Sequence, residues 1–160
     1  DHLAPRTFLS SGAAGTLGAG TAVAIGASAS STSPVVGITG DGGFLFTATE
    51  LATAVQHGIP CNILLFNDGA YGNVRRIQKM RFGADRTIAS TLENPDFAKL
   101  ADAFGVRYWH ADSPDSMAPA LGEAIDHDGP CLVEVAVSEM PDPWPFLRLP
   151  PNRRPRVAPA

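Results

Sequence analysis

Two acidic glycine turns, each placed directly after an apolar run, constrain the fold of this chain more than any other feature. Gly40-Asp41-Gly42-Gly43 follows the apolar run 35–39, and Asn67-Asp68-Gly69 follows the run 63–66. Short apolar runs bounded by turn residues are typical of buried strands, and two parallel strands would bring the turns side by side at the carboxyl edge of a sheet. Mg²⁺ is usually bound by one or two carboxylates together with phosphate oxygens. The pattern therefore predicts a site for a divalent metal and a phosphorylated ligand at that edge.

Strand-like and helix-like segments alternate along the whole chain. We expect strands at 35–39, 62–66, 106–109 and 131–137. We expect helices at 15–30, 44–57, 71–80, 94–104 and 114–126. Such alternation is typical of parallel βαβ units, so the predicted fold is α/β, a doubly wound parallel sheet with helices on both faces.

Details of two helices can be predicted from their residues. The first, at 15–30, is rich in Gly and Ala, which suits close packing on a sheet. In the fourth helix we expect Asn94 to be the N-cap and Pro95 to occupy the first helical position, and Gly105 ends the apolar periodicity.

The length of 160 residues predicts one domain, and we assign it to 1–139. The remaining segment, 140–160, is rich in Pro and is expected to form an extended C-terminal arm. Its apolar side chains Trp144, Phe146 and Leu147 favour docking on a neighbouring domain or subunit, with disorder as the alternative.

Composition and charge exclude several classes of function. The net charge is −4 and the domain has no long basic stripe, so no nucleic-acid partner is expected. Apolar stretches are interrupted well before the ~18 residues that a membrane helix needs, so no membrane span is expected. With a polar start at Asp1 and His2, a cytoplasmic location is predicted. Cys61 and Cys131 are expected to be buried thiols, and the four histidines lack metal-ligand spacing.

Common phosphate-binding motifs do not account for the acidic turns. The chain has no Gly-x-x-x-x-Gly-Lys-Ser/Thr sequence, which excludes a P-loop nucleotidase. The segment 18–23 lacks the third glycine of a Rossmann fingerprint, and no strand precedes it.

The two turns together resemble the thiamine-diphosphate motif, in which Gly-Asp-Gly is followed, after the next strand, by an Asn/Asp pair. The flanking segments 5–12, 15–18 and 140–146 look like the carboxyl-terminal, diphosphate-binding domain of acetolactate-synthase-like enzymes. The resemblance covers nearly the whole chain. It implies the thiamine-diphosphate-binding fold, with thiamine diphosphate and Mg²⁺ as cofactors.

The resemblance also implies a set of site residues. Asp41 and Asp68 would ligate Mg²⁺ through their side chains and Ala70 through its backbone carbonyl. The family often has asparagine at position 68, so aspartate here adds a negative charge. Main-chain N–H groups of Gly42 and Gly43 would bind the diphosphate. The other implied cofactor-binding residues are Gly15, Leu17, Gly40, Tyr71 and Gly72.

Leu17 matches the bulky apolar residue that family members place under the bent cofactor, and an ordinary core leucine is the alternative. Tyr71 and Gly72 would line the cofactor or close the loop over it. Arg75, Arg76 and Arg81 are candidates for binding a substrate carboxylate, with surface solvation as the alternative.

The implied reaction is decarboxylation of a pyruvate-like 2-oxo acid followed by carboligation. In the family, a glutamate on a separate pyrimidine-binding domain of another subunit activates the cofactor. Glu50 lies on the helix after the first turn and is expected to be a surface residue, so we expect no catalytic residue in this chain and no turnover by it alone. The implied partners are a pyrimidine-binding domain or subunit and further copies of the same chain.

Two alternatives stay open. One is a non-catalytic or split subunit of a thiamine-dependent decarboxylase. The other is an unrelated metal-dependent phosphohydrolase that uses the same two aspartates. The second is disfavoured because no further acidic pair stands near either turn, and Asp85 and Glu93 are loosely placed.

Overall fold

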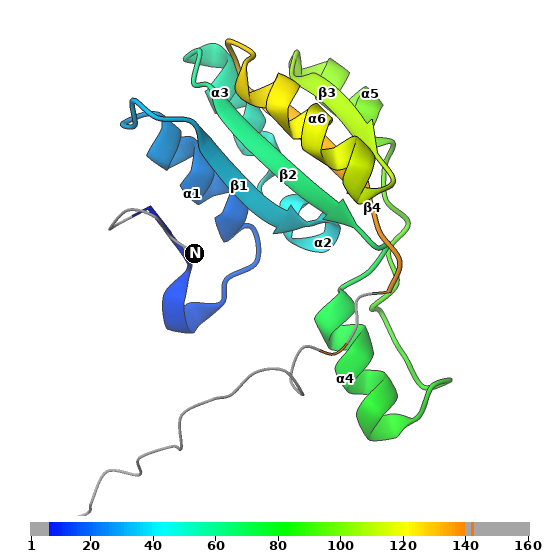
Figure 1. Cartoon of the computed structure of the whole chain (residues 1–160). Coiled ribbons are helices and arrows are strands. Elements are labelled where there is room, and N and C mark those ends of the chain that lie inside the picture. Colours follow the sequence, from blue (N-terminus) through cyan, green and yellow to red (C-terminus); the bar gives the residue numbers. More distant parts are fainter. Residues whose placement is uncertain (1–6, 140–141, 143–160) are drawn as a thin grey trace, which may run out of the picture.

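A four-stranded sheet forms the centre of the computed structural model, which describes residues 7–139 and 142 (Figure 1). Every strand pair is parallel, and the order across the sheet is β1-β2-β4-β3. The strands are β1 (Val35–Gly40), β2 (Cys61–Asn67), β3 (Arg107–Ala111) and β4 (Cys131–Ala136). All four carboxyl ends therefore lie along one edge, where ligands bind in open α/β sheets.

Helices connect the strands and cover both faces of the sheet (Figure 1). The α-helices are α1 (Ala19–Ser28), α2 (Asp41–Phe44), α3 (Leu51–Gln56), α4 (Gly72–Phe82), α5 (Phe97–Phe104) and α6 (Pro114–Ile125). Two short 3₁₀ helices, η1 (Gly12–Ala14) and η2 (Ala48–Glu50), complete the described elements.

Successive residues of β2 point to opposite faces, so the sheet has two separate apolar cores. Ile63 and Leu65 pack in the core that α1, α3 and α5 cover. Leu64 packs in the second core, together with Ala120 and Ala124 of α6. The predicted doubly wound α/β fold is thereby confirmed.

Small residues bring α1 close to the sheet, as its composition predicted. A Cβ added at Gly20 would lie 2.7 Å from the backbone oxygen of Ile38, and one added at Gly37 would lie 2.5 Å from Ala24 Cβ. A larger residue at either position would therefore push α1 away from β1.

The helix predicted at 44–57 was wrong in its start and its continuity. Helix α2 begins at Asp41, directly after β1, and ends at Phe44. Thr47 interrupts the helical structure beyond that point: its φ of −135° is not helical, and its hydroxyl donates a hydrogen bond to the backbone oxygen of Gly18 at 2.8 Å. The chain resumes helical structure in η2 and α3, so this long-range contact divides the predicted helix.

The N-cap predicted at Asn94 was also wrong. Helix α5 begins at Phe97, and its cap is Asp96, whose Oδ1 accepts a hydrogen bond from the N–H of Lys99 at 3.1 Å. Asn94 instead donates to the carboxylate of Asp41 at 2.6 Å. The side chain of Asn94 is thereby directed to the carboxylate of Asp41, and its Oδ1, the atom that would cap a helix, has no hydrogen-bond partner among the described residues.

In the part of the chain that the structure describes, no helix has the length and apolarity needed to cross a bilayer. Both cysteines are buried and free, as expected. The docking residues expected in the C-terminal arm, Trp144, Phe146 and Leu147, lie outside the described residues.

Candidate functional site

A cavity of about 490 Å³ lies at the carboxyl edge of β1 and β2. Its walls come from the turn before α1, from α2, from the loop between β2 and α4, and from the start of α4. Nine of the ten residues that the sequence suggested for cofactor binding line it: Leu17, Gly40, Asp41, Gly42, Gly43, Asp68, Ala70, Tyr71 and Gly72. Gly15 is not among the lining residues and ends η1 in a left-handed conformation.

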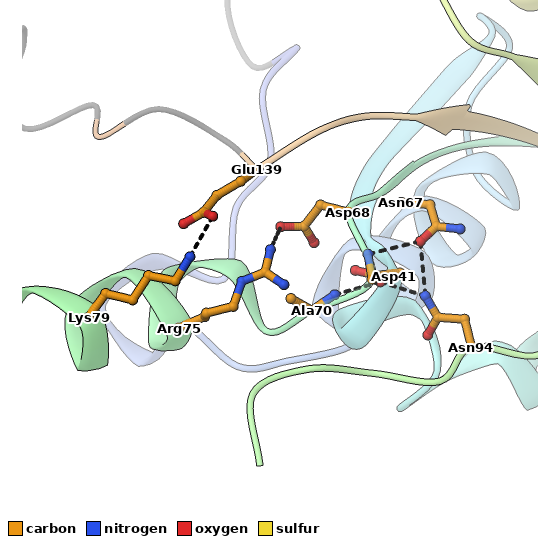
Figure 2. Close-up of polar contacts among 9 residues, drawn as sticks. Asp41, Asn67, Asp68, Ala70, Arg75, Lys79, Asn94 and Glu139 are labelled. Carbon is orange, nitrogen blue, oxygen red and sulfur yellow. Dashed lines mark hydrogen bonds and ion pairs between the residues drawn. The ribbon is translucent and has the colours of Figure 1, made fainter. Parts of the chain in front are cut away.

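Asp41 is the most buried acidic residue of the cavity wall, with 1% of its surface exposed. Its Oδ2 accepts two hydrogen bonds, from the N–H of Ala70 at 3.1 Å and from Nδ2 of Asn94 at 2.6 Å (Figure 2). No described residue donates a hydrogen bond to Oδ1. One carboxylate oxygen is thus held by the protein, while the other borders the cavity without a donor among the described residues.

Asp68 supplies a second carboxylate to the same cavity. Burial raises its pKa, and the charge of Asp41 acts in the same direction, while Arg75 opposes both. The guanidinium of Arg75 lies 3.3 Å from Asp68 Oδ2 (Figure 2). A bound cation would relieve the repulsion between the two carboxylates, so this pair of aspartates favours a positive ligand.

The three arginines suggested for substrate binding have different surroundings. Arg75 pairs with Asp68, and Arg76 pairs with Asp142 at 2.8 Å. Arg81 is exposed. Two of the three are therefore engaged in ion pairs with acidic residues of this chain.

Glycines let other groups approach the two aspartates closely. A Cβ at Gly42 would lie 2.6 Å from the ring of Tyr71, and one at Gly72 would lie 2.6 Å from Asp68 Oδ2. Tyr71 also packs edge-to-face against Phe46, with ring centroids 6.5 Å apart. Side chains at either glycine would displace a wall of the cavity.

Leu17 is not a core leucine, because 49% of its surface is exposed and it borders the cavity. This excludes the alternative considered for it. Glu50 is exposed, as expected for a surface residue.

Sequence reasoning missed three residues that support the site. Asn94 was assigned to a helix cap, and neither Asn67 nor Glu134 was assigned a role. Asn67 accepts a hydrogen bond from Asn94 at 2.9 Å and donates one to Glu134 at 2.7 Å. The available signal was Glu134 itself, a charged residue inside the otherwise apolar strand β4.

The donor atoms suit a hard cation that also binds phosphate. Among the described residues, no group of three or more His, Cys, Asp or Glu side chains is placed to hold a metal. A cation here would therefore depend on two carboxylates, backbone oxygens and ligand oxygens. That is the usual environment of Mg²⁺, whereas structural zinc takes four protein ligands.

Comparison with known proteins decides the family. The model of the thiamine pyrophosphate enzyme C-terminal TPP binding domain matches residues 1–135. The chain belongs to this family. Membership implies thiamine diphosphate as the cofactor, with Mg²⁺ as its usual partner metal.

Several relatives of this thiamine pyrophosphate domain are acetolactate synthases. The large subunit of acetolactate synthase isozyme 2 from Escherichia coli is 35% identical over 147 residues, which are 91% of this chain and 27% of that protein. A probable acetolactate synthase large subunit from Methanocaldococcus jannaschii is 40% identical over 134 residues, which are 83% of this chain and 23% of that protein.

A solved structure agrees with the fold. The thiamine diphosphate-dependent 4-hydroxybenzoylformate decarboxylase of Rhodococcus jostii RHA1 superposes with a TM-score of 0.73 at 33% identity, over 79% of this chain and 24% of that one. The chain spans about a quarter of the length of these relatives.

Proposed function

We propose that this domain binds Mg²⁺ and the diphosphate of thiamine diphosphate in an acetolactate-synthase-like enzyme, which decarboxylates a pyruvate-like 2-oxo acid and joins the product to an acceptor. The observation that carries the proposal is the hydrogen bonding of the Asp41 carboxylate. This buried carboxylate has one oxygen occupied by two hydrogen bonds and the other unoccupied by any described donor, at the wall of the cavity.

In this proposal, Asp41 Oδ1, a side-chain oxygen of Asp68 and the backbone carbonyl of Ala70 bind the cation. The N–H of Ala70 points to Asp41, which fixes the loop between β2 and α4 relative to the end of β1. Two carboxylates and one carbonyl leave coordination positions for phosphate oxygens and water, as Mg²⁺ usually requires.

The diphosphate would lie against the start of α2. The first N–H groups of a helix have no intrahelical acceptor, and here they belong to residues at the wall of the cavity, among them Gly42 and Gly43. Because Gly42 has no side chain, Tyr71 packs directly over this turn. The ligand would thus be held between backbone donors and the cation, with Leu17 and Tyr71 bordering the same cavity.

When bound, thiamine diphosphate supplies an electron sink for loss of carbon dioxide and for formation of a carbon–carbon bond. The residues of this chain bind and orient the cofactor. The acid that activates it would come from a pyrimidine-binding domain, which is the proposed partner, in an assembly that contains further copies of the chain. We therefore propose that the 160-residue chain alone has no carboligase activity.

The test is a calorimetric titration of thiamine diphosphate into the chain, with Mg²⁺ and again with a chelator, for wild type and for Asp41→Ala. We expect binding that requires both Mg²⁺ and Asp41. Glu50→Ala is the matched control, because this exposed carboxylate lies outside the cavity and its loss should leave binding unchanged.

Binding that persists in chelator, or that survives in Asp41→Ala, would contradict the proposed metal site. Carboligation by the isolated chain would contradict the need for a separate activating domain.

A further inference from the structure

Glu134 is a buried acidic residue in the middle of β4, with 9% of its surface exposed. Both carboxylate oxygens have partners: Nδ2 of Asn67 donates to Oε1 at 2.7 Å, and the hydroxyl of Tyr108 donates to Oε2 at 2.6 Å. Burying a carboxylate in a sheet lowers stability unless it is compensated, and an apolar residue would fit the pattern of this strand. The position of Glu134 therefore calls for an explanation other than stability.

The hydrogen bond to Glu134 selects one orientation of the Asn67 amide. In this orientation, Asn67 Oδ1 accepts from the N–H of Gly69 at 3.2 Å and from Nδ2 of Asn94 at 2.9 Å. Rotating the amide by half a turn would place its oxygen opposite the oxygen of Glu134, and its N–H₂ opposite two other donors. An apolar side chain at position 134 would not distinguish the two orientations as strongly.

The orientation of Asn67 in turn determines what Asn94 does. Nδ2 of Asn94 donates to Asn67 Oδ1 and also to Asp41 Oδ2, the latter at 2.6 Å (Figure 2). If Asn67 presented its N–H₂ group instead, Asn94 Nδ2 would face another donor and would lose this position. Hydrogen bonds thus connect Glu134 on β4 to Asn67 at the end of β2. They continue from Asn67 through Asn94 to the carboxylate of Asp41, directly after β1.

We propose that Glu134 is a positioning residue for the cation site: through Asn67 and Asn94 it holds Asp41 Oδ2 as a hydrogen-bond acceptor and so leaves Oδ1 for the metal. This inference rests on the proposed function, because it assigns the cation to Asp41. Glu134 does not line the cavity and does not touch the cofactor in this proposal.

Tyr108 completes the arrangement on the far side of Glu134. Burial raises its pKa, and the hydrogen bond to Glu134 acts in the same direction, so its hydroxyl remains a donor at neutral pH. With Oε2 occupied by Tyr108, Oε1 is directed to Asn67.

The first part of the test measures backbone hydrogen exchange in the 160-residue chain without metal or cofactor. The variants are Glu134→Leu, Glu134→Gln and the control Glu123→Gln, whose exposed carboxylate accepts a hydrogen bond from Trp109 and has no link to the site. The reporters are the N–H groups of Gly69 and Ala70, which donate to Asn67 and Asp41 respectively.

We expect Glu134→Leu to speed exchange at Gly69 and Ala70 more than at the core strand amides. A loss of general stability would speed all of them together. Glu134→Gln should keep most of the protection, since its amide oxygen can accept from Asn67 while its N–H₂ donates to the oxygen of Tyr108. Glu123→Gln should change neither reporter.

The second part measures Mg²⁺ affinity by titration in excess thiamine diphosphate. We expect Glu134→Leu to weaken Mg²⁺ binding about tenfold to a hundredfold, as is usual for residues that orient metal ligands, and Glu134→Gln to weaken it much less. Equal exchange effects across the sheet, or an unchanged Mg²⁺ affinity in Glu134→Leu, would overturn the positioning role. If wild type binds neither Mg²⁺ nor cofactor, the proposed function fails and the cation assignment with it, while the exchange pattern still decides whether Glu134 orients Asn67.

Discussion

The guanidinium of Arg75 lies 3.3 Å from the carboxylate of Asp68, and both side chains are largely buried, with 14% and 10% exposed. The pair joins the start of α4 to the turn after β2. Arg75 places a positive charge beside this buried carboxylate. The aspartate and the arginine therefore form one unit beside the proposed metal site.

Removing Arg75 alone should destabilise the chain. Arg75→Met leaves Asp68 buried beside Asp41 without its positive partner, and we expect the free energy of unfolding to fall by about 1.5–3 kcal/mol. Adding Asp68→Asn should restore most of this loss, because the uncompensated charge is removed as well. Denaturant unfolding of wild type, both single variants and the double variant measures the coupling. Additive effects would contradict the pairing.

Substitution by asparagine should weaken Mg²⁺ binding much more at Asp41 than at Asp68. Asp41→Asn must use its amide oxygen for the N–H of Ala70 and the side chain of Asn94, which turns its N–H₂ group towards the metal position. We expect it to lose Mg²⁺-dependent cofactor binding. Asp68→Asn keeps an oxygen for the metal, and we expect Mg²⁺ affinity within about tenfold of wild type. Titration of Mg²⁺ in excess thiamine diphosphate makes the comparison, and equal losses would contradict it.

Two glycines of α1 should respond in opposite directions to the same substitution. Gly20→Ala puts a Cβ 2.7 Å from the backbone oxygen of Ile38, so we expect a loss of about 1–3 kcal/mol in the free energy of unfolding. Gly26 has nothing within 4 Å of its added Cβ. Gly26→Ala should therefore gain up to about 1 kcal/mol from helix propensity. The measurement is the denaturant midpoint of unfolding in each variant, compared at an unchanged m-value. A lower free energy of unfolding in both variants would contradict the close-packing argument.

Stability should fall at alkaline pH because of the two buried thiols. Burial raises the pKa of Cys61 and of Cys131 from 9.0 to about 11. Between these values the unfolded chain loses its thiol protons before the folded chain does, so the stabilising contribution is complete below pH 9 and is lost as pH rises towards 11. Each thiol contributes at most about 1.4 kcal/mol per pH unit.

The measurement is the free energy of unfolding between about pH 8 and pH 11 for wild type and for the Cys61→Ala, Cys131→Ala double variant. Lysines and tyrosines titrate in both proteins, so the difference between the two curves isolates the thiols. Parallel curves would show that the thiols do not contribute.

Much of the architecture was predictable from the sequence because it depends on local patterns. The four strands appeared within one or two residues of their predicted bounds, since apolar runs between turn residues have few other ways to be buried. The turns at Asp41 and Asp68 met at one edge because adjacent parallel strands must end together. The match to the thiamine-diphosphate motif also led to the correct family.

The errors came where a distant partner outweighed a local preference. Thr47 divides a predicted helix because its hydroxyl reaches Gly18, and Asn94 left its predicted cap for the carboxylate of Asp41. Local propensity cannot anticipate either contact, because both partners come from other parts of the chain.

By itself, the sequence determined the fold class, the family and the place of Asp41 and Asp68 at one edge of the sheet, since each depends on residue type and spacing along a strand and its turn. Only the tertiary structure decided which oxygen of Asp41 the described residues leave without a donor and what holds the other. Those facts depend on Asn94, Asn67 and Glu134, which are far apart in the chain and come within hydrogen-bond distance only when the strands are paired. Hydrogen bonds act over about 3 Å, so their pattern is set by packing and not by sequence order.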